Sequence, residues 1–242
     1  MKYFHIYNRG AHKAQIFHEG GDYERMLKLL YIANCSQPFL LRDFENKNVF
    51  EYERKDILVN ITAYCLMPNH VHLKLEEDDQ VSHLRITKFM RKLCTAYSQY
   101  YNLKYDHSGT IWQGSFKEKS SGDERYSDII TSYIHLNPYG IEEPEMTKEA
   151  KFENIAEAVK CAENYEYSSM KDYLGENRKQ STIINRRDRG VTSVSPVEPS
   201  ANYRGETSAK DKDKDKEPVN PENITKSPYE PPDESRQPPE NG

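Results

Sequence analysis

Two histidines separated by one residue are the side chains of this chain best suited to chemistry. His70 and His72 lie in the stretch 67–73 (MPNHVHL), and the residues on both sides are typical of β-strands. Because side chains alternate between the two faces of a strand, the two imidazoles point the same way. Imidazoles fixed side by side are two ligands of a divalent-metal site. The alternative is a pair of surface histidines on an edge strand, and the spacing alone leaves both interpretations open.

A tyrosine and an asparagine one helical turn apart form a second candidate group. Residues 124–136 show helical periodicity, and Asp123 is a suitable N-cap. Tyr133 and Asn137 fall on one face of this helix. An amide in a buried stripe needs a partner, and a metal ion held by the paired histidines would supply one. Without that metal, the periodicity indicates only that Tyr133 is a core aromatic residue.

Together these four side chains predict phosphoryl transfer on DNA. A metal ion held by two histidines and an amide polarises a scissile phosphate and stabilises the charge that develops as the bond breaks. A tyrosine hydroxyl attacks phosphorus and forms a covalent intermediate, which conserves the bond energy for rejoining to another 3′-hydroxyl. No nucleotide cofactor is needed, and the sequence contains no Walker-type glycine loop.

The elements that must position these residues mix strands and helices. Periodicity and turn residues predict strands over 2–8, 57–66, 70–76 and 115–120, and helices over 22–34, 82–102, 124–136 and 148–163. Asp22 is the expected N-cap of the first helix. Residues 35–55 mix aromatic and charged side chains, so we expect an irregular insertion there.

The composition changes near residue 185. Nine of the 13 prolines lie beyond residue 191, and Lys and Asp alternate over 210–216. Such a segment cannot bury enough apolar surface to offset the entropy of ordering it. We therefore expect one domain over 1–184, followed by a disordered tail over 185–242.

Charge and cysteine usage narrow the class of protein. The net charge of −5 argues mildly against a nucleic-acid partner, but global charge does not report on a local groove. Four widely spaced cysteines predict neither a zinc knuckle nor a disulfide framework, and they suit a reducing cytoplasm. The sequence shows no apolar run long enough to cross a bilayer and no signal-peptide pattern at its start. We expect a cytoplasmic protein without a membrane partner.

Three motifs in order along the chain resemble a known family. They are MPNHVHL at 67–73, WQGSFK at 112–117 and YIHLNP at 133–138. They resemble the single-tyrosine HUH transposases, and within these the REP-associated tyrosine transposases. The resemblance covers about residues 1–176. Two features depart from it: the insertion over 35–55 is longer than in compact members, and the tail has no counterpart.

The resemblance implies a fold, a site and a substrate. The implied fold is α+β, a ferredoxin-like antiparallel sheet with helices on one face. His70 and His72 match the metal ligands, Asn137 the third polar ligand, and Tyr133 the nucleophile. The implied ion is Mg²⁺ or Mn²⁺. The implied substrate is single-stranded DNA, often at the foot of a hairpin, cut to leave a 5′-phosphotyrosine and a free 3′-hydroxyl.

Basic and aromatic side chains are candidates for contacts with that DNA, because cations neutralise phosphates and aromatic rings stack on bases. A basic helix is alternatively an ordinary solvated surface, and a lone tryptophan is often a core residue. The candidate residues are Arg9, Arg85, Lys88, Arg91, Lys92, Trp112 and Lys117.

Several alternatives stay open at this stage. A relaxase-like or replication-type nicking protein would use the same chemistry, although the sequence carries no helicase domain. A domesticated hairpin-binding protein would keep the fold without cutting. A zinc hydrolase fits least, because a third strong ligand and a general base are missing. Tyr97, Tyr100 and Tyr101 are competing tyrosines, but packing suits them better, and the oligomeric state is either monomer or homodimer.

Overall fold

Four strands form one antiparallel sheet in the computed structural model, which describes residues 2–40, 44, 48–77, 83–142 and 155–185. The strand order is β2-β3-β1-β4. The strands are β1 (Lys2–Arg9), β2 (Asn60–Met67), β3 (His70–Glu77) and β4 (Lys117–Ser121). Helix α1 (Gly20–Ile32) connects β1 to β2, and α2 (His83–Lys104) connects β3 to β4. This order and connectivity are ferredoxin-like, so the predicted α+β class is confirmed.

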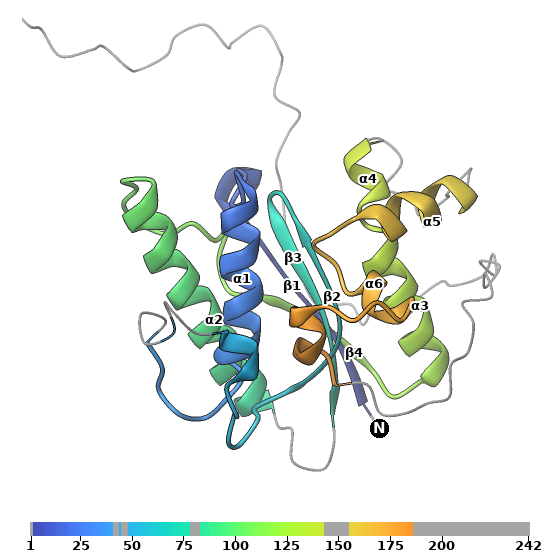
Figure 1. Cartoon of the computed structure of the whole chain (residues 1–242), viewed down its shortest axis with the longest axis horizontal. Coiled ribbons are helices and arrows are strands. Elements are labelled where there is room, and N and C mark those ends of the chain that lie inside the picture. Colours follow the sequence, from blue (N-terminus) through green and yellow to red (C-terminus); the bar gives the residue numbers. More distant parts are fainter. Residues whose placement is uncertain (1, 41–43, 45–47, 78–82, 143–154, 186–242) are drawn as a thin grey trace, which may run out of the picture. The chain divides into compact units, whose positions relative to one another are not determined.

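The helices cover both faces of the sheet, which corrects the expectation that they lie on one face. Figure 1 shows α1 and α2 on one side of the strands and α3 (Glu124–Leu136) on the other. Phe4 and Ile6 of β1 pack in the large core with α1 and α2. On the opposite face, Ile134 of α3 packs against Cys65 and Met67 of β2. Both faces of β2 carry apolar side chains, and each of them needs a helix to exclude water.

The segment after α3 closes the outer edge of β2. Leu66 N donates to Tyr167 O at 2.9 Å, and Ser169 N donates to Tyr64 O at 3.0 Å. These bonds occupy backbone groups of β2 that β3 does not use, so this edge of the sheet is capped. The segment contains short helices, which are α4 (Tyr139–Glu142), α5 (Ile155–Asn164), α6 (Met170–Tyr173) and the 3₁₀ helix η5 (Lys179–Ile183).

The insertion predicted over 35–55 is described in part. Its described residues include the 3₁₀ helix η3 (Val49–Glu51), and Phe39, Phe44 and Phe50 pack against the main core. The first residues of the helix predicted over 148–163 lie outside the described residues, as does the predicted tail beyond Asn185. Within the described part of the chain, no helix is long and apolar enough to span a membrane.

Candidate active site

The two histidines lie at the start of β3, just after a tight connection from β2. Their register partners on β2 are Met67 for His70 and Cys65 for His72, so both rings lie on the face that α3 covers. The connection is anchored from outside, because Pro68 O accepts bonds from Ile16 N at 2.8 Å and Phe17 N at 3.1 Å. The two imidazoles therefore project from a rigid corner of the sheet.

The two imidazoles are close together and hold little charge. Their ring centroids are 4.8 Å apart, with the rings nearly perpendicular. Burial, together with the charge of Arg9, lowers the pKa of His70 to about 4, although a hydrogen bond to the Asn137 side chain acts in the other direction. Burial and the neighbouring His70, His5 and Arg9 hold the pKa of His72 well below its ordinary value. Both rings are thus neutral at pH 7, which is the form that binds metals.

Helix α3 brings Tyr133 and Asn137 to the same place. The Tyr133 ring lies edge-on to His72, with 5.6 Å between the centroids. Asn137 keeps helical dihedral angles although Pro138 follows it, and its Nδ2 donates to Tyr133 O at 2.9 Å. Its side chain also hydrogen-bonds to His70. The structure thus brings together all four side chains that the sequence analysis singled out.

Tyr133 is too exposed for a core residue. Its exposed fraction is 41%, whereas its neighbour Ile134 is completely buried. The helix therefore turns Ile134 toward the sheet and leaves the phenol at the surface, beside the histidines. The alternative of a core aromatic at position 133 does not describe this arrangement.

Side-chain hydrogen bonds cap α3 and join it to β3 and to the segment that follows. Asp123 caps its first turn by accepting from Arg125 N at 2.9 Å, as the sequence predicted. Lys74 Nζ of β3 donates to Thr131 Oγ1 at 2.9 Å. Near the C-terminal end, His135 Nε2 lies 2.8 Å from Ser169 Oγ. Tyr133, between these contacts, is held in place by groups that do not touch it.

The donor set fits a small divalent cation of the Mg²⁺ or Mn²⁺ kind. Among the described residues, no three His, Cys, Asp or Glu side chains are grouped to hold a metal ion. A cation at this corner would therefore take His70, His72 and the Asn137 amide oxygen, and complete its shell with water or phosphate oxygens. His70 Nδ1 is 2.5 Å from Asn69 Oδ1, which leaves Nε2 of this ring for a ligand role.

Strand β1 supplies site residues that the sequence analysis did not single out. Tyr7 pairs with His72 across the ladder, and His5 is the next residue on the same face. Their rings lie 6.0 Å and 5.1 Å from the His72 ring. On β4, Lys119 pairs with His5, and its charge contributes, after burial, to lowering the pKa of His5 to about 4. The alternation of Tyr3, His5, Tyr7 and Arg9 was visible in the sequence, but its partner strand was not.

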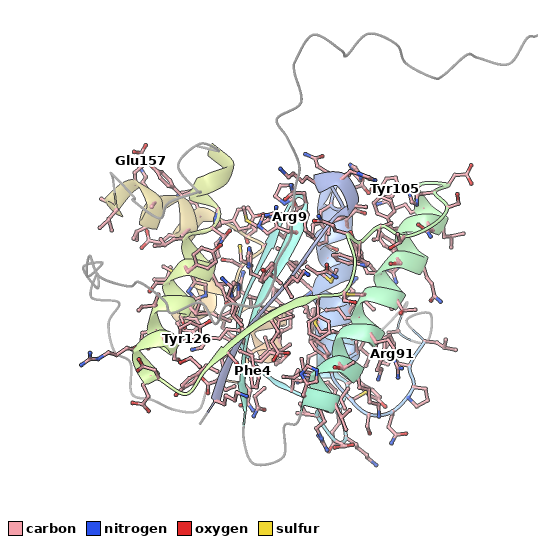
Figure 2. The ribbon with its side chains drawn as sticks, turned by 180° about the vertical axis from the view of Figure 1, so that it is seen from behind. Phe4, Arg9, Arg91, Tyr105, Tyr126 and Glu157 are labelled. Atoms are coloured by element: carbon pink, nitrogen blue, oxygen red, sulfur yellow. The ribbon has the colours of Figure 1, made fainter. Side chains whose placement is uncertain are left out.

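The predicted DNA-contact residues fall into three groups, which lie at the candidate site, on α2 and in the core. Arg9 pairs with His70, and Lys117 pairs with Tyr7, so both lie at the candidate site, and both are exposed. The others, except for the tryptophan, lie on α2 across the sheet from α3. Figure 2 shows Arg91 on α2, on the side away from Tyr126 of α3. Two of the α2 residues already have partners: Arg85 pairs with Asp56 at 2.8 Å, and Lys92 donates to Gln37 O at 2.7 Å.

Trp112 and the competing tyrosines are packing residues in this structure. Trp112 is only 6% exposed, and its Nε1 donates to Cys94 O at 3.3 Å. Tyr97 is completely buried and donates to Ile16 O. Tyr100 donates to Asp22 at 2.8 Å, and Tyr101 lies 2.9 Å from His18 Nε2. These three tyrosines belong to α2, so none of them lies on the face that carries His70 and His72.

Both the sequence and the structure of this chain are similar to those of known transposases. The model of the family described as "Transposase IS200 like" matches residues 40–137, a range that holds β2, β3 and α3. A solved structure of a REP-associated tyrosine transposase bound to a REP hairpin is similar to this chain at 18% identity, with a TM-score of 0.42. The alignment covers 83% of this chain and 93% of that one. No curated protein matches. Residues 40–137 of this chain, which include the paired histidines, Tyr133 and Asn137, are thus similar to the IS200-like transposases.

Proposed function

We propose that this chain is a transposase, a metal-dependent endonuclease and strand transferase for single-stranded DNA, with Tyr133 as its nucleophile. One observation carries the proposal: an exposed tyrosine lies 5.6 Å, centroid to centroid, from His72, and the amide one turn later bonds to His70. A nucleophile must be open to its substrate and close to the groups that stabilise the developing charge. Tyr133 meets both conditions.

We assign metal binding and phosphate binding to different side chains of the site. His70, His72 and Asn137 are the proposed ligands of Mg²⁺ or Mn²⁺, and burial keeps both imidazoles neutral so that they can act as ligands. When bound, the cation polarises the scissile phosphate and offsets its charge. Arg9, Lys117 and Lys119 are exposed on the same face and neutralise neighbouring phosphates of the strand.

The chemical step is a transesterification. Tyr133 Oη attacks phosphorus, the Oη–P bond forms, and the P–O3′ bond breaks. The phenol loses its proton, and the departing 3′-oxygen gains one, so the products are a 5′-phosphotyrosine and a free 3′-hydroxyl. The phosphotyrosine ester retains the energy of the broken bond. The 3′-hydroxyl of another strand can therefore attack it, restore a phosphodiester and release the tyrosine.

The motif resemblance supports a hairpin-associated target, as in the REP-associated branch. Labelled single-stranded oligonucleotides bearing hairpins from the DNA that flanks the gene would be incubated with purified protein, in Mn²⁺ or in EDTA. We expect a shifted band that resists denaturant, needs the metal and disappears in Tyr133→Phe.

Tyr7→Phe is the matched control, because Tyr7 is the other tyrosine whose ring lies near His72. This variant should still form the covalent band. If Tyr7→Phe loses the band and Tyr133→Phe keeps it, the nucleophile has been misassigned. If wild-type protein only retards the hairpins, without metal and without a covalent band, the chain is a hairpin-binding protein that does not cut.

A further inference from the structure

A third histidine lies beside the proposed metal ligands. His5 Nε2 is 2.8 Å from His72 Nδ1, and the two rings are stacked, with 17° between their planes. Both side chains are almost completely buried, His5 at 6% and His72 at 5% exposed. His5 lies in β1, outside residues 40–137, so the family match does not cover it.

The bond between these two rings has a direction. A neutral imidazole carries one N–H and one lone pair, so one ring must donate and the other must accept. If His72 donates from Nδ1, its Nε2 keeps a lone pair that can bind a cation. If His5 donates from Nε2, the proton of His72 is on its own Nε2, and that nitrogen cannot be a ligand. Only the first arrangement is compatible with His72 as a metal ligand through Nε2.

His5 is held in a fixed position beside His72. It belongs to a central strand and pairs with Lys74 of β3 on one side and with Lys119 of β4 on the other. Its ring also lies edge-on to Tyr133, with 5.6 Å between the centroids. The ring therefore contacts both the proposed ligand and the proposed nucleophile.

We propose that His5 is a positioning residue, whose Nε2 accepts a hydrogen bond from His72 Nδ1 and thereby keeps His72 Nε2 free to bind the divalent cation. Partners of this kind orient metal-binding histidines in other proteins, and losing one typically lowers metal affinity about 10- to 100-fold. The inference deepens the proposed function, because it assumes that this corner binds a metal ion.

The experiment uses metal-free full-length protein and no DNA. Long-range ¹H–¹⁵N NMR correlations report which nitrogen of His72 is protonated, and titration with Mn²⁺, followed by the EPR signal of the free ion, gives the affinity. His5→Gln places an amide oxygen near the position of Nε2 and keeps an acceptor. His5→Met has a similar length and no such acceptor.

We expect His72 to be protonated at Nδ1 in the wild type and in His5→Gln. In His5→Met the Nε2–H form should appear, and the affinity for Mn²⁺ should fall by about 10- to 100-fold. A wild-type His72 protonated at Nε2 would overturn the proposal, whatever the variants do. Equal Mn²⁺ affinity in His5→Met and wild type would overturn it as well.

The outcome is separable from that of the proposed function. If the tautomer and the Mn²⁺ affinities behave as expected but no covalent DNA adduct forms, the inference about His5 stands and the strand-transfer function fails. If the adduct forms and His5→Met binds Mn²⁺ as the wild type does, the function stands and the role of His5 fails.

Discussion

Asn137 combines two contacts that are usually separate in a helix. Its Nδ2 donates to the carbonyl oxygen of Tyr133, in the last turn of α3, at 2.9 Å. Because Nδ2 is used in that bond, the amide oxygen is the atom that accepts the hydrogen bond from His70. The residue thus links the backbone of the nucleophile to the first proposed ligand.

The two contacts can be separated by substitution. Asn137→Asp keeps an oxygen at this position and adds a negative charge, so it should bind Mn²⁺ at least as tightly as the wild type. Asn137→Ala removes the oxygen, and its Mn²⁺ affinity should fall by about tenfold or more. Mn²⁺ titration of the metal-free variants measures both values. An alanine variant with unchanged affinity would remove Asn137 from the ligand set.

At the scale of elements, Asp22 ties the start of α1 to the end of α2. It is completely buried, and its carboxylate accepts from Lys104 Nζ at 2.5 Å, Tyr105 at 2.6 Å and Tyr100 at 2.8 Å. It also accepts from the backbone of His18 at 2.8 Å. Glu19 is the N-cap of α1, and Asp22 completes the capping box at the third helical position, which corrects the expectation that Asp22 is the cap.

This carboxylate predicts a pH dependence of stability. Burial alone would raise the pKa of Asp22, but the hydrogen bonds from Lys104, Tyr105, His18 and Tyr100 outweigh it and hold the pKa well below the ordinary 3.8. The unfolded chain therefore takes up the proton first as the pH falls. The stabilisation is fully present above about pH 5 and is lost progressively below about pH 4.

Asp22→Asn should lower the free energy of unfolding by about 3 kcal/mol at pH 7, because a buried amide cannot accept all of the hydrogen bonds that the carboxylate takes from Lys104, Tyr105, Tyr100 and His18. The variant should also lose the part of the acid dependence that Asp22 causes. Glu19→Gln is the control, because Glu19 binds the same Lys104 at 2.6 Å but is largely exposed, and it should cost less than about 1 kcal/mol. Urea unfolding between pH 3 and pH 7 measures both. Equal losses in the two variants would show that the buried carboxylate has no special role.

At the scale of the whole molecule, local charge matters more than the net charge of −5. Arg9 of β1 and Lys117 and Lys119 of β4 are exposed, and they pair with His70, Tyr7 and His5 respectively. Helix α2, which carries the other basic residues, lies on the other side of the sheet (Figure 1), and its buried residues pack in the large core. A strand of DNA that reaches Tyr133 would therefore meet the first group and not the second.

Binding to single-stranded DNA at several salt concentrations tests this division. Each phosphate contact on a single strand adds about 0.7 to the slope of log K against log salt. Lys117→Ala and Lys119→Ala should each reduce that slope by about this amount, and Arg91→Ala should leave it unchanged. Fluorescence anisotropy with a labelled oligonucleotide in EDTA measures binding without cleavage. A reduced slope for Arg91→Ala would show that α2 contacts the phosphates of the bound DNA.

The sequence by itself determined the local structure of the site. Strand alternation placed His70 and His72 on one face, and helical periodicity placed Tyr133 and Asn137 one turn apart, because both depend only on the repeat of the local backbone. The predicted bounds of α3, 124–136, agree with the structure because Asp123 and the Asn137-Pro138 pair are strong local signals at its two ends.

Only the tertiary structure decided what lies across from these residues. Pairing of β1 with β3 brings His5 and Tyr7 to His72, although 67 residues separate His5 from His72. The choice of face for α3 exposes Tyr133 and separates it from the basic helix α2. Strand register and helix docking depend on the packing of the complete core, which local sequence does not encode. The sequence did not decide whether Trp112 stacks on a DNA base or packs in the core, because that depends on the same packing. In the structure Trp112 lies in the core.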